Sequence, residues 1–271
     1  MKVAAIQMVS AIAREANLAR AHDLLAEAAA AGAELAVLPE YFCMMGRRDT
    51  DKLALRETAG AGTVQSFLAD AAREFGLWIV GGTLPIETDD DQHVFNSSLV
   101  YAPDGERVAR YDKIHLFFFD NGRERYDERR VIAPGTRPVC FELPSRDGHR
   151  WRIGMSVCYD LRFPELYRAL ARQGVELLLV PSAFTRTTGA AHWEVLLRAR
   201  AIENLAWVVA PAQGGTHENG RQTWGQSMVV DPWGAVVAEQ AEGEAVLLAD
   251  LDAGRVEAAR AQLPALSHRV L

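Results

Sequence analysis

Residues 152–165 read RIGMSVCYDLRFPE, and they place a cysteine, Cys158, at the junction of two predicted elements. The apolar run before the cysteine is typical of a buried strand. Residues 165–173 are typical of a helix, with Pro164 in its first turn and Gly174 as its C-terminal stop. The thiol is therefore predicted at the carboxyl end of a strand, where open α/β sheets bind ligands. Because a free cysteine is more often a small core residue, its partners must decide between the two interpretations.

The composition indicates an ordinary globular protein. The 271 residues are 49% hydrophobic and 24% charged, and the net charge of −7 is spread without a basic block, which argues against nucleic acid and acidic membranes as partners. No apolar run approaches the length of a bilayer span, and the N-terminus lacks signal-peptide features, so we expect a cytoplasmic protein. Cys43, Cys140 and Cys158 form no CxxC pair, which predicts free thiols; we interpret the first two as structural.

A pattern occurs twice in the chain. Residues 98–109 and 227–238 both read S-x-V-x-x-P-x-G-x-x-V-A, which is typical of a strand, a Pro/Gly turn and a returning strand. The same offset relates Trp-Ile-Val at residues 78–80 to Trp-Val-Val at residues 207–209. Two matches at one offset indicate two similar halves.

The predicted elements favour one fold class. In the first half we expect strands at 3–7, at 35–38 and around Trp78 and Leu99, and helices at 12–31 and 63–75. In the second half we expect a strand before Cys158, a helix after Pro164, strands at 176–180 and around Val208, Met228 and Leu247, and a helix at 191–204. This order predicts an α/β protein in which two half-sheets, each covered by helices, form a four-layer αββα sandwich within a single domain, residues 1–271. The alternative is a three-layer doubly wound sheet.

Three further residues have the chemistry to act with the cysteine. Glu40 follows a buried strand in Leu38-Pro39-Glu40, at the same edge of the sheet as Cys158. Lys113 lies in the run YDKIHL at residues 111–116, and Glu128 lies in the charged run YDERR at residues 126–130. Taken singly, each has an ordinary alternative, because loop carboxylates are usually solvated and a lysine with apolar flanks can extend its amine to water.

In combination, these motifs resemble the nitrilase (carbon–nitrogen hydrolase) superfamily from Lys2 to about Asp250. Members carry a strand-P-E motif, a Y-D-K-x-H-L motif and a C-Y-D-x-R-F-P-E motif in this order. The resemblance implies the nitrilase-like αββα fold, hydrolysis of carbon–nitrogen bonds other than peptide bonds and a homodimer. It also implies a Glu-Lys-Cys triad of Glu40, Lys113 and Cys158, with Glu128 as a second carboxylate that orients Lys113 and the substrate.

The chemistry explains why these residue types are required. A thiol with a pKa near 8.5 is mostly protonated at neutral pH, so Glu40 is predicted to be the general base. Lys113 and the backbone N–H of Tyr159 are predicted to stabilise the oxyanion that forms when the thiol attacks an amide. Ammonia then leaves, and water hydrolyses the cysteinyl thioester.

The second half resembles the amidase branch, and more narrowly the deaminated glutathione amidases, in the runs PSAFT (181–185), AHWEVLLRARAIEN (191–204) and DPWG (231–234). The resemblance implies that a terminal amide of a small anionic 2-oxo acid is cleaved. Arg162 is predicted to bind the carboxylate of that acid, and the alternative is that it only caps the turn. We expect Tyr41, Thr185 and His192 to contact the substrate as well. The apolar residues 117–119 and Gln226 depart from the family pattern and put the substrate preference in doubt.

Other functions remain open from the sequence. The same triad is suited to a nitrilase or an N-carbamoyl amino acid amidohydrolase, and a scaffold without turnover is a further alternative. His115 or His192 is a possible partner of Cys158 in a Cys-His dyad. The seven histidines have no zinc-binding spacing, and Gly81-Gly82 and Gly214-Gly215 fit no nucleotide-binding pattern, so we predict neither metal nor cofactor.

Overall fold

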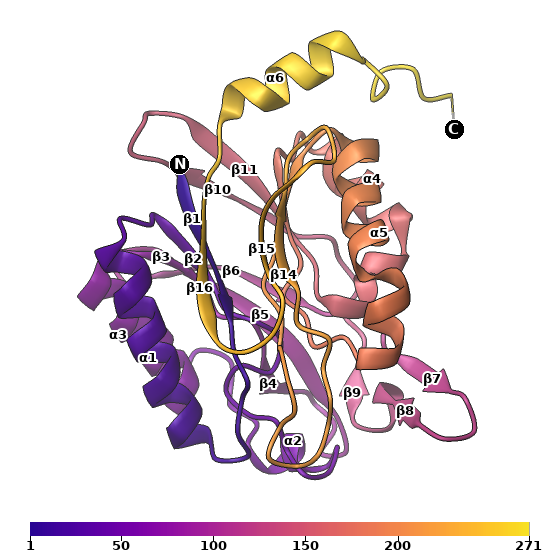
Figure 1. Ribbon diagram of the computed structural model, residues 1–271. Coiled ribbons are helices and arrows are strands. Elements are labelled where there is room, and N and C mark those ends of the chain that lie inside the picture. The colour runs from indigo at the N-terminus through magenta and orange to yellow at the C-terminus, as the bar shows by residue number, and fades with distance from the viewer. Residues whose placement is uncertain (271) are drawn as a thin grey trace.

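Two large β-sheets lie between helices in the computed structural model, which describes residues 1–270 (Figure 1). The strands of the first sheet are β1 (Lys2–Gln7), β2 (Leu35–Val37), β3 (Trp78–Val80), β4 (Leu84–Glu87), β5 (Val94–Tyr101), β6 (Arg107–Asp112), β9 (Ile132–Ala133) and β16 (Ala245–Asp250). Their order is β16-β1-β2-β3-β5-β4, and β6 and β9 also pair with β5. The parallel pairs β1-β2 and β2-β3 direct their carboxyl ends to one edge.

The second sheet follows the order of the chain. Its strands are β10 (Cys140–Pro144), β11 (Arg150–Met155), β12 (Leu177–Leu179), β13 (Trp207–Ala210), β14 (Ser227–Val230) and β15 (Val236–Gln240). A separate small hairpin is formed by β7 (Phe118–Asp120) and β8 (Arg125–Asp127).

Helices cover the outer faces of both sheets. They are α1 (Arg14–Ala30) and α3 (Thr63–Phe75) on the first sheet, and α4 (Pro164–Arg172) and α5 (Arg186–Asn204) on the second. Two further helices, the short α2 (Asp51–Ala54) and the C-terminal α6 (Ala253–Gln262), lie outside these layers. The predicted four-layer αββα sandwich is therefore confirmed, and the three-layer alternative is wrong. No helix within residues 1–270 is both long and apolar enough to span a bilayer.

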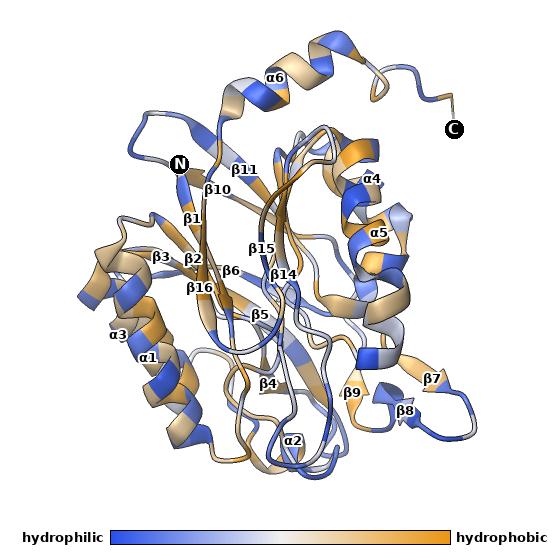
Figure 2. Ribbon diagram, viewed as in Figure 1, coloured by the Kyte–Doolittle hydropathy of each residue, from blue (hydrophilic) through white to orange (hydrophobic). Residues whose placement is uncertain are grey.

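The period of two along a strand explains the layers. In β1, Val3 and Ala5 join the core cluster that includes Ile153 of the second sheet, whereas the alternating residues Ala4 and Ile6 pack in the cluster that contains α1 and α3. The central strands β1, β2 and β3 are mostly hydrophobic, whereas the outer strand β6 carries two arginines and an aspartate (Figure 2). Both faces of the first sheet are thus buried at its central strands.

The repeated pattern forms the same structure in each half. It gives the antiparallel pair β5-β6 in the first sheet and β14-β15 in the second, each with a register shift at the matching position. The adjoining strands β3 and β13 carry the repeated Trp-x-Val run and pair with β5 and β14. The predicted internal repeat is confirmed.

Two elements differ from the sequence-based expectation by more than one or two residues at an end, one in where it begins and one in the sheet it joins. The helix expected at 191–204 begins at Arg186, because the side chain of Thr185 accepts a hydrogen bond from the Thr188 N–H. Position 189 of this helix requires a glycine, because a Cβ there would lie only 2.2 Å from the Cβ of Trp224. The strand around Leu247, expected with the second half, is β16, which pairs antiparallel with β1 and covers its edge.

Candidate active site

Three chain segments bring Glu40, Lys113 and Cys158 together. Glu40 lies just beyond the carboxyl end of β2, Lys113 directly follows β6, and Cys158 lies just beyond β11. Glu40 and Lys113 therefore come from the first sheet and Cys158 from the second. The site forms where the ends of the two facing sheets meet.

Two site residues have an unusual backbone conformation. Cys158 has φ of 50° and Tyr41, directly after Glu40, has φ of 57°. A non-glycine residue in the left-handed region costs about 1–3 kcal/mol and is held there by its surroundings. The Cys158 N–H donates to the Pro181 carbonyl at 3.0 Å, and the Tyr41 N–H donates to the Thr83 hydroxyl at 3.0 Å. These bonds fix the two turns that present the thiol and the carboxylate.

Lys113 is fully buried between two carboxylates. Its Nζ lies 2.9 Å from Glu40 Oε1 and 2.8 Å from Glu128 Oε2. Burial alone would lower the pKa of Lys113, but the charges of Glu128 and Glu40 outweigh it and raise that pKa. The amine is therefore a fixed cation, and the alternative of a lysine that extends to water is wrong.

Every described partner of the Glu40 carboxylate is a hydrogen-bond donor. Oε1 accepts from Lys113 and from the side-chain amide of Asn96 at 3.0 Å, and Oε2 accepts from the Ala183 N–H at 3.0 Å. The side chain is 1% exposed, so the alternative of a solvated loop glutamate is wrong. Sequence reasoning missed Asn96, although an amide inside the apolar strand β5 was a signal that a buried polar group needs a partner.

Glu128 is also held in place by donors. It lies in a short 3-10 turn, η1 (Glu128–Arg130), and accepts hydrogen bonds from Lys113, from the Tyr41 hydroxyl at 2.9 Å and from the Phe117 N–H at 2.7 Å. Burial opposes the charged form, but Lys113 and these hydrogen bonds hold the pKa of Glu128 below its usual value. A solvated loop residue would lack these contacts.

Cys158 begins the 3-10 turn η2 (Cys158–Arg162) and is 8% exposed. Burial and the negative charge of Glu40 raise the pKa of the thiol well above its ordinary value, and Lys113 opposes them only in part. The free site therefore holds a thiol beside a carboxylate, so the proton must move as the bond to the substrate forms.

The other two cysteines lie elsewhere. Cys43 is buried, with its pKa raised to about 12 by burial, and Cys140 on β10 contacts the side-chain amide oxygen of Gln173 at 3.3 Å. All three cysteines are free. Neither Cys43 nor Cys140 lines the cavity beside Cys158.

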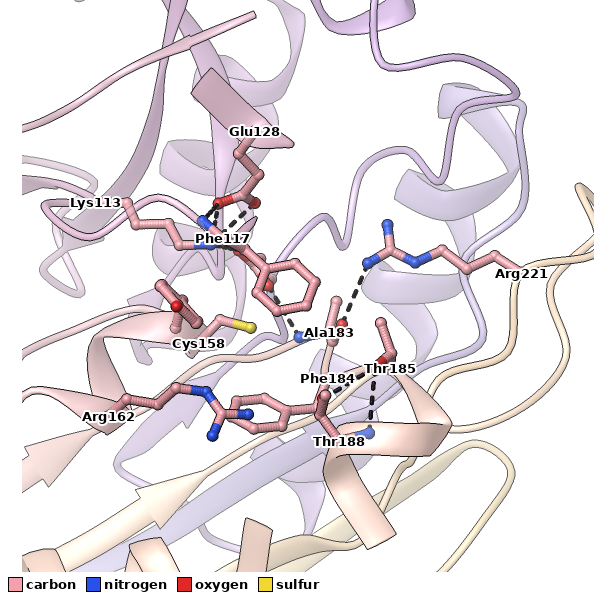
Figure 3. Close-up of a pocket in the computed structure, with 12 residues that line it drawn as sticks. Lys113, Phe117, Glu128, Cys158, Arg162, Ala183, Phe184, Thr185, Thr188 and Arg221 are labelled. Atoms are coloured by element: carbon pink, nitrogen blue, oxygen red, sulfur yellow. Dashed lines mark hydrogen bonds and ion pairs between the residues drawn. The ribbon is translucent and has the colours of Figure 1, made fainter. Parts of the chain in front are cut away.

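A small cavity adjoins the thiol (Figure 3). Glu40, Lys113, Glu128 and Cys158 line this cavity. Its other walls include Phe117, Tyr159, Arg162, Phe184, Thr185 and Arg221. Its volume is about 20 Å³, which holds about one water molecule.

Two of the four residues predicted to contact the substrate line the cavity, and the other two contact residues of its wall. Arg162 and Thr185 line the cavity, whereas Tyr41 reaches it through Glu128 and His192 contacts Arg162 at 3.2 Å. The guanidinium of Arg162 lies over the rings of Tyr159 and Phe184, at 5.7 and 5.3 Å from their centroids.

The histidines have other partners. The Nδ1 of His115 lies 2.7 Å from Asp160 Oδ1, and its ring stacks on Phe163 with centroids 3.7 Å apart. His192 contacts Arg162. Within residues 1–270 neither ring is hydrogen-bonded to Cys158, so the geometry does not support a Cys-His dyad.

Comparisons with known proteins agree with this geometry. A family model described as carbon-nitrogen hydrolase matches residues 2–261. A Synechocystis deaminated glutathione amidase is 40% identical over 98% of this chain and 97% of its own length. The crystal structure of the Caenorhabditis elegans NitFhit protein aligns with a TM-score of 0.88 and 38% identity, over 99% of this chain and 65% of that chain. A Saccharomyces cerevisiae structure, a member of branch 10 of the nitrilase superfamily, aligns with a TM-score of 0.85 and 30% identity, over 97% and 94%.

Proposed function

The chain belongs to the carbon–nitrogen hydrolase family, and we propose that it is a thiol-dependent amidase for a terminal amide of a small 2-oxo acid. It is a hydrolase of carbon–nitrogen bonds other than peptide bonds. One observation carries the proposal for the site: a buried lysine, fixed between two carboxylates, lines the same cavity as a buried thiol.

In the proposed first step, Glu40 accepts the Cys158 proton as the sulfur attacks the amide carbon. The negative charge that develops on the carbonyl oxygen is stabilised by Lys113 and by the Tyr159 N–H. One such donor typically contributes about 2.7–4 kcal/mol to the transition state. Because Lys113 is held as a cation by two carboxylates, it supplies charge here and need not supply a proton.

In the second step the tetrahedral intermediate collapses. Protonated Glu40 gives its proton to the amide nitrogen, the carbon–nitrogen bond breaks, and ammonia, or the amine of a substituted amide, leaves a Cys158 thioester. A water molecule then enters, Glu40 removes its proton, and attack on the thioester carbonyl releases the carboxylic acid and restores the thiol. Each step needs a group beside the reacting carbon that can accept a proton and return it. Glu40 is suited to this role, because its carboxylate is hydrogen-bonded to both Lys113 and the Cys158 thiol.

Two findings support a 2-oxo acid as the acyl part. The Synechocystis relative is named a deaminated glutathione amidase, and Arg162 turns a guanidinium toward the cavity without a carboxylate at ion-pair distance among residues 1–270. We propose that Arg162 binds the substrate carboxylate, that His192 positions Arg162, and that Tyr41 positions Glu128. Thr185 supports the cavity wall, because its hydroxyl contacts that of Thr188 at 2.9 Å.

The test compares substrate classes on the purified protein. We expect ammonia from 2-oxoglutaramate and the dipeptide from deaminated glutathione, at rates far above those for aliphatic nitriles and N-carbamoyl amino acids. Cys158→Ala should abolish turnover, whereas Cys43→Ala and Cys140→Ala should retain it. Turnover of nitriles or carbamoyl compounds alone would overturn the substrate assignment, and turnover by Cys158→Ala would overturn the nucleophile.

We further propose that residues 1–271 act as a single domain and associate as a homodimer. Val195 and Ile202 lie two turns apart on one face of α5, and Trp233 lies in the β14-β15 turn beside it. All three are exposed, Val195 by 68% and Trp233 by 57%. Gly234, next to Trp233, faces the side chain of Ile202, so Trp233 and Ile202 lie side by side, and we propose that they form the centre of the contact.

A further inference from the structure

A larger hollow adjoins the active-site cavity. Its volume is about 670 Å³, and its cationic lining residues are Arg47, Arg48, Lys52, Arg125, Arg130 and Arg221. Arg221 lines both this hollow and the small cavity. Tyr41 lines the hollow, while its hydroxyl contacts Glu128 of the site. The two spaces therefore share a wall.

Most of this positive charge lacks a compensating carboxylate. Asp49, the acidic residue that lines the hollow, lies 3.5 Å from Lys52, and Arg125 has Asp120 at 3.8 Å. The other four arginines of the hollow have no carboxylate within ion-pair distance among residues 1–270. In a chain whose net charge is −7, this local excess of cations indicates a place for an anion.

Arg221 is held in position without an anionic partner. Its guanidinium lies 5.4 Å from the centre of the Tyr126 ring, and Nη2 donates to the Ala183 carbonyl at 3.4 Å. Its Nε is buried and has no hydrogen-bond partner among the described residues. A buried donor without a partner is unfavourable, and an anion bound at this partly exposed guanidinium would offset that cost.

Lys52 lines the larger hollow beside Tyr41. Its side chain is 13% exposed, and its amine lies 4.9 Å above the centre of the Tyr41 ring. Burial lowers the pKa of Lys52 and the nearby charge of Arg221 adds to this effect, while Asp49 and Glu128 offset it only in part. An added anion between Lys52 and Arg221 would stabilise both cations.

The guanidinium groups of Arg162 and Arg221 approach the cavity from different sides. Figure 3 shows their side chains extending toward it from opposite directions. The acyl part and the amine part of an amide likewise lie on opposite sides of the carbon that the thiol attacks. The acyl part stays bonded to Cys158 in the enclosed cavity, whereas the amine must leave before water enters. The larger hollow, with exposed Arg47 and Arg48 at its rim, is suited to the departing amine.

We propose that Arg221 and Lys52 form a second anion subsite, which binds a carboxylate carried by the amine that leaves. This inference rests on the proposed function and deepens it. Deaminated glutathione, the compound in the relative's name, is an amide with a carboxylate at each end, so the new element is the assignment of Arg221 and Lys52 to the carboxylate of its amine part. Arg162 then binds the acyl carboxylate and Arg221 binds the other.

The experiment uses two amides that differ only at the far end. The 2-oxoglutaryl amide of glycylglycine has a free carboxylate there, and that of glycylglycinamide has a neutral amide. The readout is the ratio of kcat/KM for the charged amide to kcat/KM for the neutral one, measured by mass spectrometry of the released peptide. A loss common to both amides, as from poor folding, cancels in this ratio.

For the unaltered protein we expect a ratio of at least about ten. Arg221→Ala should bring the ratio close to one, Arg221→Glu should bring it below one, and Lys52→Ala should reduce it by a few fold. The matched control is Arg73→Ala, which removes an exposed guanidinium of α3 and should keep the ratio. Arg221→Lys should restore part of the preference.

The outcomes separate this inference from the proposed function. A ratio near one in the unaltered protein, or a ratio that Arg221→Ala and Arg221→Glu leave unchanged, would overturn the subsite while 2-oxoglutaramate is still hydrolysed. If Arg162→Ala removed the preference and Arg221→Ala did not, the two arginines would have to exchange roles. No hydrolysis of any 2-oxo acid amide would overturn the proposed function and the subsite with it.

Discussion

The Tyr111 hydroxyl donates a hydrogen bond of 2.7 Å to Oδ2 of Asp160, which is fully buried. Tyr111 lies two residues before Lys113, and Asp160 lies two residues after Cys158. The same carboxylate accepts from the Val157 N–H at 2.9 Å and from the His115 N–H at 3.0 Å. One side chain thus joins the segment that carries the lysine to the turn that carries the thiol.

Asp160→Asn should therefore lower kcat more than it raises KM. The asparagine presents an N–H₂ group to donors that need an acceptor, and each buried donor left unpaired costs about 1–3 kcal/mol. We expect kcat to fall by about tenfold or more and the melting temperature to fall by several degrees. Asp120→Asn, at an exposed carboxylate, is the control. An unchanged kcat in a folded Asp160→Asn protein would show that the link does not position the thiol.

The thiol of Cys158 should remain protonated well above neutral pH. Its ultraviolet thiolate absorbance, taken as the difference from Cys158→Ala, should appear only above the ordinary pKa of about 8.5. Because the folded-state pKa is raised, the stability that depends on the protonated thiol is complete below the unfolded pKa and is lost as the pH rises through the folded one.

Glu40→Gln provides the matched variant for this titration. It removes the negative charge that raises the pKa of Cys158 and leaves Lys113, which lowers it. The thiolate should then appear at lower pH than in the unaltered protein. A full thiolate signal at neutral pH before substitution would instead indicate a preformed ion pair and would contradict the role of Glu40 as the base.

Arg162 should separate recognition from chemistry. Arg162→Lys keeps the charge but loses the planar pair of donors, and Arg162→Ala loses both. An exposed ion pair contributes under about 1 kcal/mol, whereas a desolvated bidentate pair contributes more. We expect kcat/KM for 2-oxoglutaramate to fall at least about tenfold in both variants, mainly through KM. Equal losses on a small uncharged amide would mean that Arg162 supports the turn rather than the substrate.

The apolar surface of α5 should govern association. The unaltered protein should have about twice the 29.8 kDa chain mass in light scattering. Replacing Ile202 and Trp233 by serine together should shift the mass toward one chain, because both side chains would lose apolar burial in the contact. Val108→Ser, at an exposed valine of β6, is the control. A monomer before any substitution rules out the proposed dimer.

The strand-end positions of Glu40 and Cys158 predicted that these two residues share an edge of the sheet, and the resemblance to the nitrilase superfamily implied that Lys113 joins them; the hydrogen bond between Lys113 and Glu40 shows that pair in contact. The helix Thr63–Phe75 was also predicted with its full bounds, since its apolar period is regular. The start of α5 was missed because the cap at Thr185 and the fit of Gly189 against Trp224 depend on contacts between distant segments.

Two other features had no local signal. Arg221 lies in a polar run without periodicity, and only the folded chain shows that it reaches the cavity. The partner of β16 lies at the opposite end of the sequence, so the pattern around Leu247 indicated a strand but not its sheet. Long-range pairing is the part of a fold that local propensity specifies least.

The pairing of β1 with β16 has a consequence for biosynthesis. Lys2 faces Asp250 in this ladder, so the first strand to be made is joined along this edge by one of the last. During translation β1 can pair with β2 early. The other edge of this strand, whose side chains are apolar on both faces of the sheet, stays unpaired until residues 245–250 leave the ribosome. A nascent chain stalled before that point would expose this edge, so we expect it to depend on chaperones that shield unpaired strands.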